Sequence, residues 1–352
     1  METIFRVDRL PVFQNKMYDS PVAAIKCPKG DVVLVQDTNT GLIFNSDFDE
    51  ALMHYDSSYQ NEQASSAIFN KHLQEVGNII LHYWKGMRLV EIGCGKGYFL
   101  EHLTSEGFDI IGYDPSYEGD NPAIKKMYYG PEISIKADGI ILRHVLEHIV
   151  NPVEFLFQIR SLKPDAMIYI EVPCFDWICH NRAWFDIFYE HVNYFRKDDF
   201  VRMFGKIYES GHLFNGQYLY VLADLSTLKA PVFRGELAII PDDFLKGLYS
   251  ASNMVKEDPE GTYVVWGGAS KGVIFSLFMK RMGAEIKHII DINPAKQGKY
   301  LGGTGLKVSS PDKVLKSLPD GSTIFIMNSN YAKEIYDVAG ERFQYWRIDN
   351  DF

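Results

Sequence analysis

Short apolar runs alternate with amphipathic segments along most of the chain. Between residues 64 and 84, apolar side chains recur near the 3.6-residue period of a helix that packs with one face. Candidate buried strands follow at 89–91, at 109–114, from Asp138 onward and at 166–173. This order of strands and helices predicts an α/β protein with a mostly parallel, doubly wound sheet.

A second series of the same kind follows a break in composition at residues 226–231. It comprises helix-like segments at 241–256, 269–284 and 331–342 and strand-like segments at 263–268, 286–291 and 323–328. This repetition predicts a second Rossmann-like unit. We therefore predict three domains: a small β-rich N-terminal lid over 1–63, a central α/β domain over 64–230 and a C-terminal Rossmann-like substrate domain over 231–352.

A glycine-rich turn follows the first strand of the central series. Gly93, Gly95 and Gly97 alternate with other residues just after Glu91, and the segment beyond them is compatible with a helix. Glycines at alternate positions let a ligand lie against bare backbone at a helix N-terminus. The next strand ends in Asp114, about 20 residues on, where an acid binds ribose hydroxyls in nucleotide-binding sheets. A glycine turn followed by this acid indicates an adenosine-containing ligand.

Composition narrows the possible partners. The chain has 352 residues, and its 46 acidic side chains against 36 basic ones give a net charge of −10, which argues against nucleic acid as the main partner. No apolar stretch reaches the ~18 residues of a membrane span, and the N-terminus lacks a signal-peptide pattern, so we expect a cytoplasmic protein with no membrane partner. The sequence leaves the oligomeric state open between a monomer and a homodimer. The four cysteines form no C-x-x-C pair, so we expect neither a disulfide framework nor a metal site.

The glycine turn and the acid after it resemble the first two motifs of the class I S-adenosylmethionine-dependent methyltransferases. Later segments support the resemblance, because LRHVLEH at 142–148 is similar to the end of that family's fourth strand. The resemblance implies S-adenosylmethionine as cofactor. The residues that it implies for cofactor binding are Glu91, Gly93, Cys94, Gly95, Gly97, Asp114 and His144, the last at the cofactor's methionine end or merely as a cap of the strand.

Two other stretches resemble a narrower family, the nucleotide-sugar C-methyltransferases, which methylate 4-keto-deoxy sugars. FDIFYEHVNYF at 185–195 is similar to the family's FD-x-I-Y-H-E-H-x-x-YF signature, and 267–308 is similar to its C-terminal domain. The resemblance implies an enolate mechanism, since a carbon atom next to a carbonyl becomes nucleophilic when a base removes its proton.

The resemblance also implies roles for individual side chains. His191 is the expected base, Glu190 would orient a histidine or polarise the substrate, and His148 would donate to the enolate. Tyr189 would replace a tyrosine of the family's signature. The expected substrate-binding residues are Phe188, Tyr194, Lys271, Asn293 and Gln297.

The sequence departs from the family at several points. The N-terminal module usually binds zinc through four cysteines, but only Cys27 lies in residues 1–63, so we predict a lid without metal. Phe188 and Tyr189 stand where the family has tyrosine and histidine, and NGQY at 215–218 replaces a glycine-rich run. Sugar O-methylation, and a protein that binds S-adenosylmethionine but has a decayed acceptor site, therefore stay open as alternatives to C-methylation.

Overall fold

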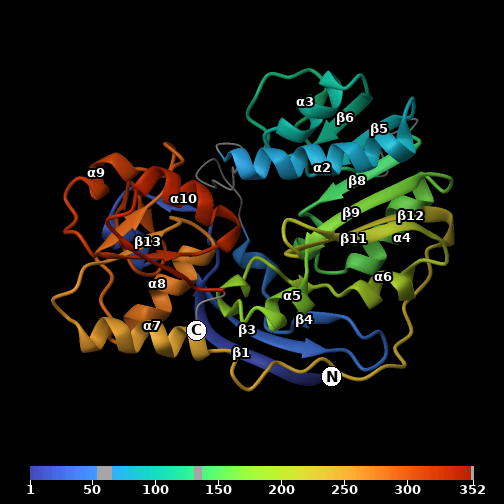
Figure 1. Ribbon diagram of the computed structural model, residues 1–352. Coiled ribbons are helices and arrows are strands. Elements are labelled where there is room, and N and C mark those ends of the chain that lie inside the picture. The colour runs from blue at the N-terminus through green and yellow to red at the C-terminus, as the bar shows by residue number, and fades with distance from the viewer. Residues whose placement is uncertain (54–65, 131–136, 350–352) are drawn as a thin grey trace.

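A computed structural model describes residues 1–53, 66–130 and 137–349, which form three β-sheets and a two-stranded ribbon (Figure 1). The central sheet has the strand order β11-β12-β9-β8-β5-β6-β7. Its strands are β5 (Arg88–Ile92), β6 (Asp109–Tyr113), β7 (Ile124–Lys125), β8 (Gly139–Arg143), β9 (Met167–Pro173), β11 (Ile207–Leu213) and β12 (Tyr218–Asp224). Strand β12 runs antiparallel to both of its neighbours, whereas β5, β6, β7, β8 and β9 pair in parallel. The predicted doubly wound α/β fold is confirmed.

Helices cover both faces of the central sheet because its strands are apolar on both sides. Along β8, Ile140 and Leu142 face one layer while Ile141 between them faces the other. The first layer contains α4 (Pro152–Leu162) and α6 (Lys197–Met203), and the second contains α2 (Ala67–Trp84) and α3 (Tyr98–Ser105). Helix α2 begins three residues after the start of the predicted helix and ends where that helix was predicted to end.

The C-terminal sheet has the parallel order β16-β14-β13-β17-β18. Its strands are β13 (Tyr263–Trp266), β14 (His288–Ile290), β16 (Val308–Ser309), β17 (Thr323–Ile326) and β18 (Gln344–Arg347). Its helices are α7 (Lys246–Glu257), α8 (Lys271–Arg281), α9 (Pro311–Leu315) and α10 (Ala332–Ala339). Val264 and Val265 of β13 face opposite layers, so this sheet is also covered on both faces.

The N-terminal sheet is antiparallel, with the order β1-β3-β4-β10. It consists of β1 (Glu2–Pro11), β3 (Lys29–Gln36), β4 (Ile43–Asn45) and β10 (Asn193–Tyr194), so its last strand comes from the middle of the chain. A ribbon of β2 (Met17–Tyr18) and β15 (Tyr300–Leu301) ties the N-terminal segment to the C-terminal unit. The remaining α-helices of the described residues are α1 (Pro21–Ile25) and α5 (Phe175–His180), and the 3₁₀ turns are η1 (Glu50–Leu52), η2 (Leu146–His148), η3 (Trp184–Asp186), η4 (Leu225–Thr227) and η5 (Ser329–Tyr331). The domain boundaries predicted from the sequence stay a prediction.

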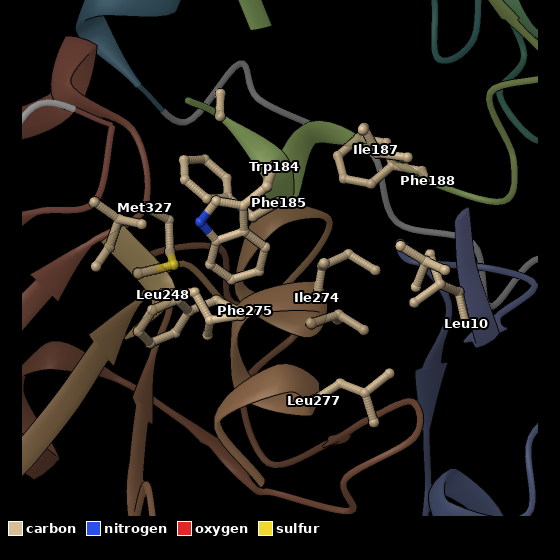
Figure 2. Packing of buried hydrophobic residues seen from close by; sticks show 14 of the residues in the cluster. Leu10, Trp184, Phe185, Ile187, Phe188, Leu248, Ile274, Phe275, Leu277 and Met327 are labelled. Atoms are coloured by element: carbon tan, nitrogen blue, oxygen red, sulfur yellow. The ribbon is translucent and has the colours of Figure 1, made fainter. Parts of the chain in front are cut away.

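One hydrophobic cluster joins the N-terminal sheet, the aromatic-rich residues 174–195 that follow β9 (the aromatic segment) and the C-terminal unit. Figure 2 shows Trp184 and Phe185 against Phe275 of α8, with Leu10 of β1 across from them. The ring centroids of Trp184 and Phe275 lie 6.1 Å apart, and Trp184 is 2% exposed. Much of the aromatic segment therefore serves as the packing between units.

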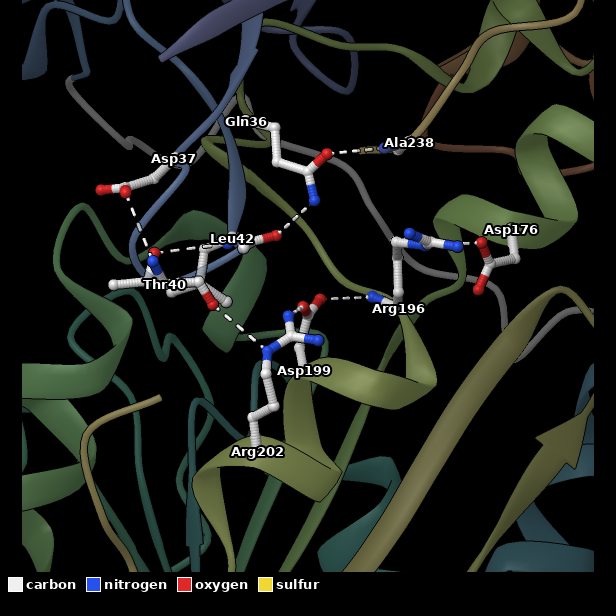
Figure 3. Close-up of polar contacts among 10 residues, drawn as sticks. Gln36, Asp37, Thr40, Leu42, Asp176, Arg196, Asp199, Arg202 and Ala238 are labelled. Carbon is white, nitrogen blue, oxygen red and sulfur yellow. Dashed lines mark hydrogen bonds and ion pairs between the residues drawn. The ribbon is translucent and has the colours of Figure 1, made fainter. Parts of the chain in front are cut away.

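Polar contacts also tie the N-terminal sheet to its surroundings (Figure 3). On α6, Arg202 forms an ion pair with buried Asp199 and donates to the carbonyl oxygen of Thr40 at 3.2 Å. Gln36 of β3 accepts a hydrogen bond from the backbone N–H of Ala238 at 2.7 Å, which holds the segment that leads into the C-terminal unit.

In the part of the chain that the structure describes, no helix has the length and apolarity that crossing a membrane requires.

Candidate active site

The glycine turn after β5 has the open backbone that the sequence predicted. Gly93, Gly95 and Gly97 have φ angles of 73°, 54° and 86°, which favour glycine, and Gly97 caps the N-terminus of α3. Asp114, just after β6, accepts a hydrogen bond from the backbone N–H of Gly95 at 2.8 Å. Its other oxygen accepts from the backbone N–H of Ser116, also at 2.8 Å. These bonds fix the turn and the acid together at the carboxyl ends of two adjacent strands.

Glu91, the last but one residue of β5, is 2% exposed and lines the same cavity as the turn. Burial raises the pKa of its carboxyl group to about 7, although the positive charge of Arg143 opposes the change. Among the described residues, no hydrogen-bond donor reaches its Oε2. The site thus holds a carboxylate oxygen that a cationic ligand group would satisfy.

The buried Glu171 of β9 contacts three basic side chains. Its Oε1 lies 3.1 Å from Arg143 Nη2, 3.1 Å from His72 Nε2 and 3.1 Å from His144 Nε2. Its Oε2 accepts from the Tyr169 hydroxyl at 2.9 Å. Two histidines and a carboxylate could in principle bind a metal ion, but the Arg143 guanidinium already occupies this carboxylate with positive charge.

His144 has a φ of 53°, an unusual conformation for a residue with a side chain, and its backbone N–H donates to the Glu171 carbonyl at 2.9 Å. Burial lowers the pKa of its imidazole, but the neighbouring Glu147 and Glu171 carboxylates outweigh burial and raise it to about 9. His144 is therefore a cation at neutral pH and lines the cavity.

A second cluster lies one turn further on, where 3₁₀ helix η2 meets the segment after η3. Glu147, His148 and His191 bring one carboxylate oxygen and two ring nitrogens within 4.8 Å of one another. Burial, and to a lesser extent His148, lowers the pKa of His191 to about 3, so its ring is neutral. His148 Nδ1 lies 2.8 Å from the carbonyl oxygen of Glu190, which leaves its Nε2 for another partner.

Adjacent side chains on an extended segment point to opposite faces, so Glu190 and His191 can face one pocket only where the chain bends. The chain bends at Tyr189 and Glu190, and both Glu190 and His191 line the cavity. Glu190 Oε1 also accepts a hydrogen bond from the backbone N–H of Gln14 at 2.7 Å, so this carboxylate anchors the N-terminal segment against the site.

A cavity of about 1040 Å³ connects the glycine turn with the C-terminal unit. On the far side, Asp291 after β14 accepts from the backbone N–H of Gly268 at 2.8 Å and from that of Asn293 at 2.8 Å. Lys296 Nζ lies 3.3 Å from the same carboxylate, and Lys271, the first residue of α8, lies 2.9 Å from Asp186 Oδ2. The carboxyl ends of two Rossmann-like sheets thus open into one cavity.

The structure places most of the predicted site residues along this cavity, but not all. Those that line it are Glu91, Gly93, Cys94, Gly95, Asp114, His144, His148, Phe188, Glu190, His191, Lys271 and Asn293, while Gly97 shapes the turn. Besides Gly97, the predicted residues that do not line it are Tyr189, Tyr194 and Gln297.

The interpretation of Tyr189 as a catalytic tyrosine needs correction. Its ring stacks on Phe48 with centroids 5.3 Å apart, and its hydroxyl accepts from the backbone N–H of Asp49 at 2.8 Å. The side chain therefore packs on the N-terminal sheet, away from the histidines. Tyr194 also points elsewhere, because its hydroxyl bonds the backbone of Phe188, and the amide of Gln297 donates to the Asp291 carbonyl at 3.0 Å.

Several residues of the site were not predicted from the sequence. Glu147 and Glu171 are buried acids within apolar runs, and their partners become visible only in three dimensions. Asp291 and Lys296 were also missed, although Asp291 ends a predicted strand just as Asp114 does, and this repeated position is a signal that could have identified it.

Comparisons with known proteins match this arrangement. Residues 69–207 match the family model of a methyltransferase domain, and 241–345 match that of a C-methyltransferase C-terminal domain. C-methyltransferase NovU of Streptomyces niveus is 24% identical over 72% of this chain and 69% of its own length. Ubiquinone biosynthesis O-methyltransferase of Roseobacter denitrificans is 26% identical over 24% of this chain and 40% of its own length. A SAM dependent methyltransferase from Archaeoglobus fulgidus is 19% identical, with a TM-score of 0.32 over 45% of this chain and all of that one, a likeness too low to bear on function.

The first edge of the cavity fits S-adenosylmethionine. The backbone of Gly93 and Gly95 is bare, Asp114 presents a carboxylate at the ribose position, and the unpartnered Glu91 oxygen suits a cationic group. With both family models matched in order and one relative covering most of the chain, the protein belongs to the S-adenosylmethionine-dependent methyltransferases that carry a C-methyltransferase C-terminal domain.

Proposed function

We propose that the protein methylates a carbon atom of a nucleotide-linked keto sugar through an enolate. The observation that supports the proposal is the shared cavity, which His148 and the neutral His191 line together with the glycine turn and a second Rossmann-like edge. A C-methyltransferase of this kind needs an unprotonated base and a binding site for the part of a large acceptor that does not react.

The second edge suits the nucleotide end of the acceptor. Lys271 lies at the N-terminus of α8, which has 11 residues, and helix N-termini attract phosphate groups. Lys271 and Lys296 are each 8% exposed and both line the cavity. Asp291 occupies the strand-end position at which an acid binds ribose hydroxyls in such sheets, and Asn293 lies beside it.

The histidine cluster suits the chemistry at the acceptor carbon. His191 is neutral over the physiological pH range and so has a lone pair that can take a proton. His148, held at Nδ1 by the Glu190 carbonyl, offers Nε2 toward the cavity, where in the protonated state it would donate to an enolate oxygen. S-adenosylmethionine supplies the electrophilic methyl group when it is bound. Glu190 contributes mainly by holding the Gln14 segment and His148 in place.

The test is incubation of the purified protein with S-adenosylmethionine and the dTDP, UDP and GDP forms of 4-keto-6-deoxyhexoses in deuterated water. We expect a mass gain of one methyl group and deuterium at the carbon next to the carbonyl. His191→Gln should lower both by ~10²–10⁴-fold, the usual value of a positioned base. His180→Gln, an exposed histidine on α5, is the matched control and should retain full activity.

Other outcomes would redirect the proposal. Methylation of an oxygen atom without deuterium at carbon would support sugar O-methylation, since that reaction breaks no C–H bond. Binding of S-adenosylmethionine without methylation or exchange on any of these sugars would refute the proposed acceptor class and favour a decayed acceptor site.

A further inference from the structure

Glu147 lies at the centre of the polar groups between the two edges of the cavity. It is 1% exposed, and its Oε1 is 3.4 Å from Nδ1 of His144. It shares the 4.8 Å cluster with ring nitrogens of His148 and His191, and its Oε2 has no hydrogen-bond partner among the described residues. A buried carboxylate oxygen left without a donor is costly, so this oxygen favours the arrival of a positive charge.

The charges around Glu147 determine how readily His191 can take up a proton. The titratable groups that face Glu147 are His144, His148 and His191, and Glu190 adjoins His191 in the chain. Burial alone would raise the pKa of Glu147, but the three histidines hold it below the usual range, so the group is a carboxylate. His144 and His148 each disfavour a proton on His191, whereas Glu147 favours it. Among these groups, Glu147 is therefore the one that eases proton uptake by His191.

We propose that Glu147 is a positioning residue for the acceptor's base, holding His191 in place and balancing the charge of the imidazolium that forms there. The inference rests on the proposed function. In the step concerned, the C–H bond next to the carbonyl breaks, its electron pair stays on the acceptor as the enolate, and the proton forms an N–H bond on His191. The net charge of the protein's cluster rises by one, and the Glu147 carboxylate is the near group of opposite sign.

The rival role for the same three side chains is to bind a divalent cation. Two histidines and a carboxylate are suitable ligands. The nearby His144 disfavours this role, because burial lowers its pKa but Glu147 and Glu171 raise it to about 9, which leaves a positive charge 3.4 Å from the carboxylate. The two roles make opposite predictions about metal removal.

The experiment measures deuterium uptake from solvent into dTDP-4-keto-6-deoxyglucose, with S-adenosylhomocysteine at saturation so that no methyl group can be transferred. We compare the wild type with Glu147→Gln, which keeps the shape and removes the charge. Glu154→Gln, an exposed acid on α4, is the matched control. Each protein is treated with EDTA beforehand and tested again with Mn²⁺ or Zn²⁺ added.

We expect Glu147→Gln to lower the exchange rate by ~10–100-fold, with the KM for the sugar changed by less than about threefold. The isotope effect from deuterium at the acceptor carbon should increase, because proton removal becomes slower; a merely structural role would not change it. Glu154→Gln should behave like the wild type. If the glutamine variant fails to bind S-adenosylhomocysteine, Glu147→Asp carries the test, and it should keep exchange within about tenfold of the wild type.

Unchanged exchange in Glu147→Gln, or exchange lost in a folded Glu147→Asp, would overturn the inference. Loss of wild-type exchange on EDTA treatment with recovery on Mn²⁺ or Zn²⁺ would also overturn it, in favour of the cation. If the wild type exchanges none of the sugars, the proposed function fails instead, so the two failures are distinguishable.

Discussion

The substitution Glu91→Gln should stabilise the protein without its cofactor and weaken cofactor binding. Burial raises the pKa of the Glu91 carboxyl group to about 7 from an ordinary 4.5. A group whose pKa is raised on folding contributes its stability below its unfolded pKa and loses it as the pH rises through the folded value. Ionised Glu91 is therefore a cost to the folded protein above pH 7, and glutamine removes that cost while keeping the side chain's shape.

The magnitude follows from linkage. The shift from 4.5 to about 7 corresponds to about 3 kcal/mol at pH values well above both. Between pH 6 and 8.5, the wild type should lose about 1.4 kcal/mol of unfolding free energy relative to Glu91→Gln. The cofactor carries positive charges that the ionised carboxylate can satisfy, so binding to the wild type should strengthen as the pH rises through 7 and should release part of a proton.

The assay pairs thermal unfolding at pH 6 and 8.5 with calorimetric titration of S-adenosylmethionine in buffers of different ionisation enthalpy. Glu106→Gln, an exposed acid at the end of α3, is the control and should change neither quantity. A Glu91→Gln variant that is less stable than the wild type at pH 8.5, or that binds the cofactor as tightly and with the same proton release, would contradict this role of Glu91.

Three further predictions test the surroundings of the site. Gly112→Ala would place a Cβ atom 2.7 Å from Cys94 Sγ. We therefore expect a loss of about 1–3 kcal/mol of unfolding free energy and weaker binding of S-adenosylhomocysteine. Unchanged thermal unfolding would contradict this packing. Tyr189→Phe removes the oxygen that accepts the Asp49 N–H and should cost about 1 kcal/mol with kcat unchanged; a fall in kcat at full stability would restore a catalytic role. Burial lowers the pKa of His144, but Glu147 and Glu171 outweigh it and hold this pKa at about 9. The affinity for S-adenosylhomocysteine should therefore fall as the pH rises through that value. A constant affinity up to pH 10 would exclude a role for the imidazolium.

Sequence periodicity was most informative where a segment's burial follows from its own pattern. The apolar spacing at 64–84 corresponds to α2 at 67–84, and the glycine turn has the left-handed φ angles that alternate glycines allow. The helix predicted from 241 begins only at Lys246. Residues before it form a turn in which Asp243 is held by Arg182 at 2.8 Å, a partner 61 positions earlier. Local pattern cannot reveal such a partner.

The site was predictable to the extent that motifs mark it. Gly93, Gly95 and the three predicted histidines line the cavity, whereas Tyr189 and Tyr194 turn away because the aromatic segment must also fill the core between units. An aromatic side chain in this segment could either line the site or fill the core. Only the bend at 189–190 decides which side chains face the cavity and which face the core. Glu171 was not predicted for another reason, since its basic partners come from two segments distant in the sequence, His72 on α2 and Arg143 with His144 at the end of β8.

The two edges of the cavity share a backbone arrangement and differ in charge. Asp114 binds the N–H of Gly95 and Asp291 binds the N–H of Gly268, each at 2.8 Å. The first edge adds the buried Glu91, whose Oε2 has no hydrogen-bond partner among the described residues, while the second adds two buried lysines, Lys271 at the start of α8 and Lys296 beside Asp291. The Glu91 carboxylate oxygen suits a cationic methyl donor, and the two lysines suit an anionic acceptor. On the proposed function, this asymmetry orients the two substrates toward the histidines between them.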